Sequence, residues 1–229
     1  MSLILQLETS TTSCSVALAQ NGKVLSYKTI NQRNIHAEMI TVFIDEIFAN
    51  NHLKYNELNA VAVSAGPGSY TGLRIGVSTA KGLCFSLDKP LISVETLLAM
   101  AAGYLARFQK STEEKFLLCP MIDARRMEVY TALFDQDLKQ IEPTSAKIID
   151  AKSFKTIFDQ HKIIFFGDGA AKCSTVLSQY PNAVFNDDFF NEAVDMTTLS
   201  AEKFRLQQFE DIAYFEPFYL KDFIGSKIS

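Results

Sequence analysis

The stretch Ala60–Leu87, AVAVSAGPGSYTGLRIGVSTAKGLCFSL, predicts a strand, a tight glycine turn and a helix in direct succession. The run Ala60–Ala65 is short and apolar, with valine at alternate positions, which suits a buried strand. Gly66-Pro67-Gly68 ends that strand, because glycine tolerates positive φ and proline fixes its own φ. Apolar residues then recur at helical spacing, at Leu73, Val77, Ala80, Cys84 and Leu87.

The turn and the start of the helix are typical of an anion site. Backbone N–H groups of the turn and the positive end of the helix dipole favour a phosphate. Thr71 is the predicted N-cap, since its hydroxyl can accept from the next turn. The pattern GxGxxxG is neither a dinucleotide fingerprint nor a P-loop, so a plain strand-to-helix connection stays open as the alternative. The predicted phosphate- or nucleotide-binding residues are Gly66, Gly68, Ser69, Tyr70, Thr71 and, from the first strand, Glu8.

Composition places the chain among ordinary globular proteins. It has 229 residues, 48% of them hydrophobic, and a net charge of −4, enough for one large domain or two small ones. No apolar run is long enough to span a bilayer, and the first residues lack the features of a signal peptide. Four scattered cysteines without a CxxC pair indicate free thiols in a reducing compartment, so we expect the cytoplasm. Without a cluster of Lys and Arg, the chain is not expected to grip nucleic acid alone.

The pattern before residue 110 predicts three strands followed by alternating helices and strands. The dipeptide Asn21-Gly22 is a strong hairpin signal between two strand-like runs. A helix is expected over Ile35–Asn50, and a strand and a further helix over Pro90–Val94 and Glu95–Phe108. The polar run Gln109–Lys115 is the predicted boundary, which divides the chain into residues 1–110 and 111–229.

The pattern after this boundary begins again. The fourth strand of the second half runs into Gly167-Asp168-Gly169-Ala170, another glycine turn before a helix. The tail is expected to be extended and to return toward the first half. The other expected elements are strands at Phe116–Ile122 and Met127–Phe134, a third strand within Leu138–Ile149, helices at Ser153–His161, Ala171–Tyr180 and Asp195–Phe209, and a loop at Phe185–Phe190.

Two βββαβα-type halves predict an α/β protein with a duplicated ribonuclease H-like fold. This is the fold of the actin, Hsp70 and sugar-kinase superfamily, whose members hold nucleotides in the cleft between the halves. Fold alone does not establish function. A kinase-like site needs an acidic residue for Mg²⁺, and Glu8 and Asp123 are the candidates. The superfamily usually has Asp followed by Gly where this chain has Glu8 followed by Thr9.

Other catalytic chemistries find little support in the residues. A helical metal pair needs ligands one turn apart, but the residue four positions after His36 is Ile40. His36 is therefore expected to cap or pack, and no metal ligand or catalytic residue is predicted. Asp123 is expected to form a local turn, in which Arg125 or Arg126 can pair with it. The alternatives are a metal-dependent, glycoprotease-like peptidase and a free-standing ATP-using kinase.

Two motifs resemble the TsaB (YeaZ) family, and the resemblance extends over essentially the whole chain. They are SAGPGSYTGLRIG at Ser64–Gly76 and DARRMEVY at Asp123–Tyr130. The resemblance implies a non-catalytic scaffold and activating subunit. The complex in which it works transfers threonylcarbamoyl to N6 of the adenosine beside the anticodon, in tRNAs reading codons that start with A. The implied partners are a TsaD-type catalytic paralogue and a TsaE-type ATPase, with a homodimer when the chain is alone. Contact with tRNA is expected only through the complex, and no contact with membrane.

The resemblance also implies that the partner surface lies on the first two helices. Apolar residues cover about half of the first helix, where one core needs a stripe of only about 100°. A second apolar partner and burial between sheet and neighbouring helix both explain this excess. Phe43→Asp is expected to abolish pairing and to leave the fold intact. No tightly bound cofactor is expected, and ATP or ADP only at an interface with the partner. The predicted partner residues are Met39, Phe43, Ile47, Arg74, Val77, Ser78 and Lys81.

Overall fold

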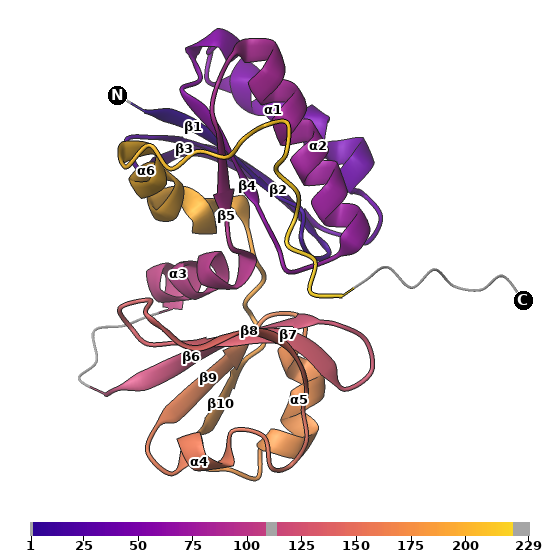
Figure 1. The fold of residues 1–229 in the computed structure, drawn as a ribbon, viewed down its shortest axis with the longest axis vertical. Coiled ribbons are helices and arrows are strands. Elements are labelled where there is room, and N and C mark those ends of the chain that lie inside the picture. Colours follow the sequence, from indigo (N-terminus) through magenta and orange to yellow (C-terminus); the bar gives the residue numbers. More distant parts are fainter. Residues whose placement is uncertain (1, 109–113, 222–229) are drawn as a thin grey trace, which may run out of the picture.

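The computed structural model describes residues 2–108 and 114–221, which form two mixed five-stranded sheets, one above the other (Figure 1). The first sheet has the order β3-β2-β1-β4-β5 and the second the order β10-β9-β6-β7-β8. The strands of the first are β1 (Leu3–Glu8), β2 (Ser13–Gln20), β3 (Lys23–Asn31), β4 (Ala60–Ser64) and β5 (Leu91–Val94). Those of the second are β6 (Phe116–Asp123), β7 (Glu128–Phe134), β8 (Gln140–Ile148), β9 (Lys162–Phe166) and β10 (Ala183–Asn186).

The two sheets repeat one topology. In the first, β1 pairs antiparallel with β2 and parallel with β4. In the second, β6 pairs antiparallel with β7 and parallel with β9. Each central strand is thus followed by an antiparallel meander on one side and parallel strands on the other. This repeat confirms the predicted α/β, duplicated ribonuclease H-like fold.

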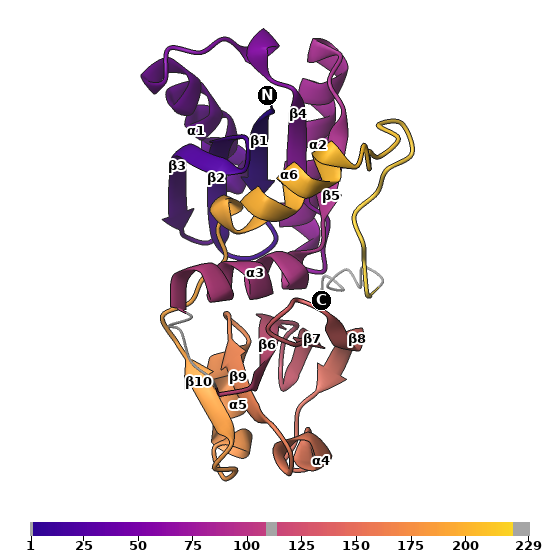
Figure 2. The same cartoon turned by 90° about the vertical axis from the view of Figure 1, so that its left-hand side faces the viewer.

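Helices cover both faces of the first sheet. The helices α1 (His36–Asn50) and α2 (Tyr70–Leu87) lie on one face, and α6 (Thr197–Arg205) lies on the other (Figures 1 and 2). Every residue of β1 and β4 is buried, because a strand covered on both faces can carry a continuous apolar run. Two short helices, α4 (Lys155–Phe158) and α5 (Ala170–Leu177), accompany the strands of the second sheet.

The helix α3 (Thr96–Phe108) lies between the two sheets and joins their cores (Figures 1 and 2). Its side chains Met100 and Tyr104 pack with Phe166 of the second sheet. Its Ala99 packs instead with Val94 of the first sheet. Because α3 buries apolar surface on both sides, it links the core of the first sheet to that of the second. No helix within residues 2–108 and 114–221 is long and apolar enough to cross a membrane.

Three expected elements differ in the structure. Residues 183–186 form β10, where a loop was expected from Phe185 onward, because Phe185 stacks on Phe165 of β9 at 5.1 Å between ring centroids. The helix expected over Ser153–His161 shrinks to α4. The helix expected over Asp195–Phe209 divides into the 3-10 turn η2 (Ala193–Met196) and α6. The strand β10 was not predicted because it has only four residues and lies in acidic, aromatic sequence, where the alternation of apolar and polar residues is too weak to indicate a strand.

The chain after β10 lies on the first sheet, where η2 contacts β1 and α6 contacts β5. Beyond α6, Glu210 forms an isolated antiparallel bridge with Leu91 of β5. The predicted boundary between residues 110 and 111 lies outside the described residues, and the division into two domains stays a prediction.

Candidate functional site: the glycine turn and the cleft

The turn between β4 and α2 is capped by Ser69. The Ser69 hydroxyl accepts from the backbone N–H of Gly72 at 3.3 Å, and Ser69 has the non-helical backbone of an N-cap. The prediction of Thr71 as N-cap is wrong, because α2 begins at Tyr70 and Thr71 lies inside its first turn. Sequence alone could not separate these two hydroxyls two positions apart.

The turn's glycines lie against the chain's own backbone. A Cβ on Gly68 or Gly72 would lie under 3.0 Å from the carbonyl oxygen of Ser10 or Thr9, in the loop between β1 and β2. A Cβ on Gly76, in the next turn of the helix, would collide with the Thr9 hydroxyl. The backbone N–H of Ser69 donates to the Ser10 carbonyl at 2.6 Å. The surface that would cradle a phosphate at Gly68 is therefore filled by residues 9 and 10.

The tail of the chain fills the other side of the turn. Gly66 has φ +106°, and a Cβ on it would lie 2.6 Å from the carbonyl oxygen of Phe218. The backbone N–H of Phe218 donates to the Ala65 carbonyl at 2.7 Å. The residues at the glycine turn do not fit a nucleotide phosphate in this arrangement. Whether the hydroxyls of Ser69, Tyr70 and Thr71 bind a nucleotide stays a prediction.

Glu8 lies at the end of β1 and is buried inside the chain. Its Oε1 accepts from the backbone N–H of Ser10 at 2.6 Å and from the Ser64 hydroxyl at 2.9 Å. Its Oε2 has no hydrogen-bond partner among the described residues. Burial raises the pKa of Glu8, because a charged carboxylate loses its hydration there. Within residues 2–108 and 114–221 no group of three His, Cys, Asp or Glu side chains could hold a metal ion.

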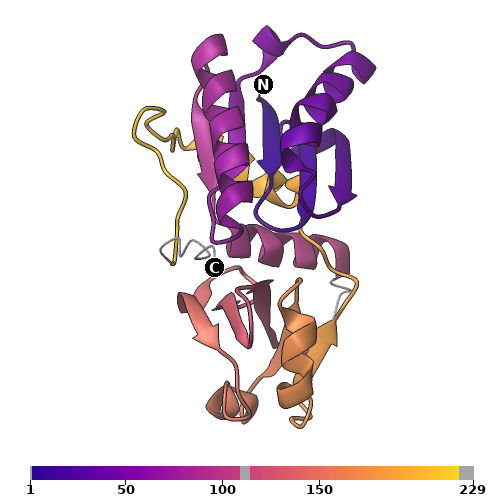
Figure 3. The ribbon, with the colours of Figure 1, turned by 90° about the vertical axis from the view of Figure 1, so that its right-hand side faces the viewer.

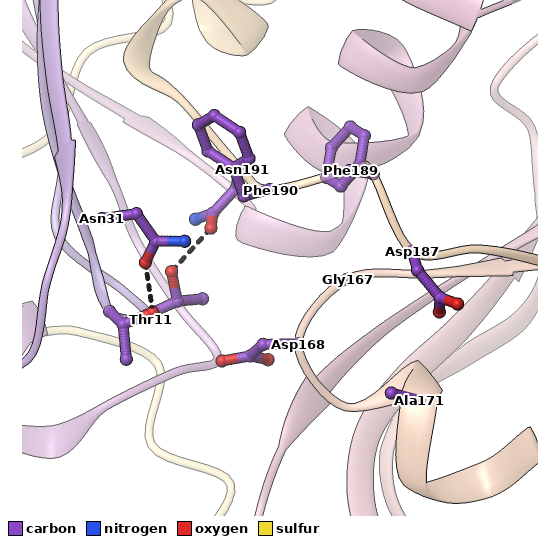
Figure 4. A pocket seen from close by; sticks show the side chains of 10 residues that line it. Thr11, Asn31, Gly167, Asp168, Ala171, Asp187, Phe189, Phe190 and Asn191 are labelled. Carbon is purple, nitrogen blue, oxygen red and sulfur yellow. Dashed lines mark hydrogen bonds between the residues drawn. The ribbon is translucent and has the colours of Figure 1, made fainter.

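A cavity of about 210 Å³ lies in the cleft between the halves (Figure 4). The first half contributes Thr11 and Asn31, and the second contributes Asp168 and Asp187. Thr11 donates to the Asn191 side-chain oxygen at 2.6 Å, and both residues line the cavity. None of the predicted phosphate-binding residues lines it. The described lining of the cavity consists of carboxylates, amides and hydroxyls and contains no Lys or Arg. Such a lining is by itself poorly suited to bind a polyphosphate, which is anionic.

Asp123 forms the predicted local turn but has a different cation as partner. Its Oδ1 accepts from the backbone N–H of Arg125 at 3.0 Å and pairs with the Lys172 ammonium. The expected pairing with the Arg125 or Arg126 guanidinium is therefore wrong. The Asp123 backbone N–H donates to Asp168, whose pKa is raised chiefly by desolvation. Lys172 comes from α5, so only the tertiary fold brings this partner to Asp123.

His36 is a packing residue. It is the first residue of α1 and is buried, with its Nε2 atom 3.2 Å from the carbonyl oxygen of Ser13. The N-cap of α1 is Ile35, so His36 does not cap the helix. The four cysteine thiols are free and buried, as expected. Burial raises the pKa of Cys14 to about 11 and that of Cys119 to about 12, which makes them poor nucleophiles.

Several predicted partner residues lie in the chain's own core. Phe43 and Ile47 of α1 and Val77 of α2 are buried in the apolar cluster under the first sheet, so their assignment to a partner surface is wrong. Burial between sheet and neighbouring helix thus accounts for the surplus of apolar residues on α1. Met39 is half-buried against the same cluster. With Phe43 only 7% exposed, Phe43→Asp is expected to unfold the chain and not merely to abolish pairing.

The outer face of α2 is partly covered by residues 211–221, which we call the strap. The strap runs beside α2 toward the second half (Figure 3). The Lys81 ammonium donates to the carbonyl oxygens of Ala213 and Phe215, both at 3.2 Å. Arg74 donates to the Tyr219 hydroxyl at 3.3 Å, and its guanidinium lies 4.1 Å above the Tyr70 ring. Two of the predicted partner residues thus bind this chain's own strap.

The remaining exposed part of α2 carries Ser78, which was predicted, and Phe85, which was not. Phe85 is 83% exposed, an unusual position for a large apolar side chain. The sequence shows that Phe85 lies at helical spacing from Ser78. It does not show that Phe85 is exposed, because the neighbouring Leu83, Cys84 and Leu87 are also apolar and the buried side of the helix cannot be told from the exposed one. Val42 of α1 is also exposed, by 40%.

Two facing halves with one strand order define the fold seen in the actin, Hsp70 and sugar-kinase class. The 2-hydroxyisocaproyl-CoA dehydratase activator from Clostridium difficile shares this fold at 9% identity, with a TM-score of 0.51 and coverage of 90% of this chain and 97% of that one. YeaZ from Pseudomonas aeruginosa shares it more fully. It is 24% identical, with a TM-score of 0.82 and coverage of 96% of this chain and 100% of that one.

Sequence comparison narrows the class to one family. The family model TsaD, tRNA N6-adenosine threonylcarbamoyltransferase, matches residues 23–215. The chain belongs to this family, on the TsaB (YeaZ) branch, which confirms the resemblance seen in the two motifs.

Two curated relatives on that branch are tRNA threonylcarbamoyladenosine biosynthesis proteins TsaB. The Haemophilus influenzae protein is 42% identical over 127 residues, 56% of this chain and 51% of that protein. The Escherichia coli protein is 37% identical over 134 residues, 58% of this chain and 55% of that protein. The chain thus spans about half the length of the curated relatives that it matches. A Staphylococcus saprophyticus tRNA N6-adenosine threonylcarbamoyltransferase is 37% identical over 108 residues, 40% of this chain and 32% of that protein.

Proposed function

We propose that this chain is a non-catalytic scaffold and activating subunit in the formation of threonylcarbamoyladenosine on tRNA. The curated relatives that it matches are named for the biosynthesis of this nucleoside. The observation that carries the non-catalytic part of the proposal is the filled glycine turn. Backbone from Thr9, Ser10 and Phe218 lies against the glycines at which the sequence predicts a phosphate site.

The proposed partners are a TsaD-type catalytic paralogue and a TsaE-type ATPase. The chain reaches tRNA through that complex and pairs with itself when alone, in the cytoplasm and without membrane contact. The partner surface that the structure supports is the exposed part of the α1–α2 face, with Val42, Ser78 and Phe85. Exposed aromatic side chains are enriched at the energetic centres of interfaces. No cofactor is held tightly, and any ATP or ADP binds at an interface with a partner.

The test is modification of tRNA by purified components, with and without this chain. The paralogue and the ATPase come from the same organism, and formation of the modified nucleoside is measured by mass spectrometry. We expect no product from this chain alone and strict dependence of the product on its presence. Full activity in its absence contradicts the proposal. Product formed by the isolated chain contradicts its non-catalytic part.

A further inference from the structure

The hairpin turn between β6 and β7 presents two consecutive arginines on a left-handed backbone. Arg125 has φ 73° and Arg126 has φ 50°. Residues with a Cβ rarely adopt positive φ, and positions with a left-handed backbone favour Gly and Asn. Such strained positions cluster where a side chain has to be presented for function. Two arginines in succession at such positions indicate that their side chains have a role that outweighs the cost in conformational energy of forming the turn.

The carboxylates beside the turn are neutralised by lysines. Asp123, before the turn, pairs with Lys172, and Glu128, after it, pairs with Lys221. These two carboxylates are the nearest partners in the sequence for the two arginines, but each already forms an ion pair with a lysine. Within the described part of the chain, neither the Arg125 nor the Arg126 guanidinium forms an ion pair, and both residues are exposed. The tip of the hairpin therefore offers two uncompensated positive charges.

The turn lies on the rim of the cleft. Asp123 is hydrogen-bonded to Asp168, which lines the cavity in Figure 4. Lys221, at the end of the described strap, reaches Glu128 on the other side of the turn. Arg33, from the loop after β3, lies close enough to Asp168 to lower its pKa. Arg33 of the first half and the two arginines of the turn thus lie at one rim of the cleft, beside the carboxylates Asp168 and Asp187 of the cavity lining.

We propose that Arg125 and Arg126 bind phosphates of the tRNA backbone within the modification complex. Arginine presents a planar fork of donors that matches phosphate geometry, and its charge does not titrate. An acidic protein surface would also attract these charges. The centre of a protein interface is depleted of charged residues, however, whereas this tip carries two adjacent charges between the partly buried Ala124 and Met127. One exposed apolar residue, Ile148, lies beside the turn, opposite Glu128. The inference rests on the proposed function and adds this chain's own residues to the tRNA contact.

The decisive variant is Arg125→Asn with Arg126→Gly, which removes both charges and relieves the turn. Its thermal midpoint is expected to rise by about 2–4 °C, because Asn and Gly suit positive φ. In the complete complex, its affinity for tRNA is expected to fall by about tenfold or more. The slope of log affinity against log salt is expected to fall by about 1.4 to 1.8, for two lost phosphate contacts. If the strained backbone at Arg125 and Arg126 serves tRNA binding, the variant should be more stable than wild type and should bind tRNA more weakly.

Two controls are matched to this variant. Arg125→Lys with Arg126→Lys keeps both charges and is expected to retain the salt slope with a smaller loss of affinity. Lys152→Ala with Lys155→Ala removes two exposed charges near α4, at the far end of the second half, and is expected to change neither quantity (Figure 1).

Unchanged tRNA affinity and salt slope in the Asn-Gly variant overturn the inference. Weaker assembly with the paralogue at unchanged tRNA affinity also overturns it and assigns the turn to a protein contact. The complex lacking this chain is measured in parallel. If tRNA binding and modification proceed fully without the chain, the proposed function fails. If they require the chain while the Asn-Gly variant behaves as wild type, only this inference fails.

Discussion

The carbonyl oxygen of Phe218 lies 2.6 Å from the position that a Cβ on Gly66 would occupy. Residues separated by more than half the chain thus define the glycine turn together. Gly66 admits the tail, just as Gly68 and Gly72 admit the loop between β1 and β2. A motif with the appearance of a phosphate cradle is here a site where three segments of one chain pack closely.

Gly66→Ala is expected to destabilise the protein by about 2 kcal/mol or more. The new Cβ would meet the Phe218 oxygen, and φ +106° is strained for any residue with a side chain. Urea denaturation measures the loss, and limited proteolysis is expected to cut the strap more readily. Gly82→Ala is the matched control, because nothing lies within 4 Å of its Cβ position. It is expected to stabilise α2 by about 0.5–1 kcal/mol. Equal effects of the two substitutions would contradict this account of Gly66.

Tyr219→Ala is expected to loosen the strap and to leave the rest of the fold intact. The Tyr219 ring lies 4.9 Å from that of Tyr70, and its hydroxyl accepts from Arg74. Exposed contacts of this kind contribute about 1 kcal/mol or less. Hydrogen exchange is expected to speed up within residues 211–221 alone. Tyr214→Ala, at a side chain that is 84% exposed, should leave the exchange rates unchanged. Faster exchange across the first sheet would show that the strap is part of the global core.

The free energy of unfolding of the Glu8→Gln variant is expected to increase relative to that of wild type as pH rises from about 4 to 8. Burial raises the pKa of Glu8, so the folded state keeps this proton to higher pH than the unfolded state does. The contribution of Glu8 to the free energy of unfolding of wild type therefore falls as pH rises above the ordinary pKa of the unfolded-state carboxyl, and the glutamine variant lacks that loss. At pH 8 the advantage is expected to be about 1 kcal/mol or more.

The comparison of the two proteins reports on Glu8 together with the groups that feel its charge. Burial raises the pKa of Asp195 to about 7, and the charge of Glu8 adds to that rise, so the loss of this charge in the variant also lowers the pKa of Asp195. Urea midpoints measured across the pH range give the two curves. Parallel curves would show that Glu8 carries no raised pKa.

Ser78→Asp and Phe43→Asp are expected to fail in different ways. Ser78 is exposed on α2, so the aspartate should leave the thermal midpoint nearly unchanged and weaken pairing with the paralogue by about tenfold. Phe43 is buried, so a carboxylate there should cost about 3 kcal/mol or more and unfold the chain. Sizing chromatography and circular dichroism separate the two outcomes. Normal pairing of a folded Ser78→Asp protein would exclude this part of α2 from the interface.

The sequence by itself determined the duplicated fold and the family. Buried strands such as Ala60–Ser64 carry apolar runs, and Gly66-Pro67-Gly68 forces a turn between strand and helix. These signals are local, since propensity and periodicity act over a few residues. The short strand β10 escaped them because its neighbour β9, rather than its own pattern, holds it in place.

Only the tertiary structure decided what the motif residues do. Whether Gly68 faces a phosphate or Ser10, whether Phe43 faces a partner or the core, and whether Asp123 pairs with Arg126 or Lys172 are all questions of long-range proximity. Spacing along the chain carries no information on such contacts. Burial by the strap and by α2, and the competition of Lys172 for one carboxylate, arise only when distant segments meet.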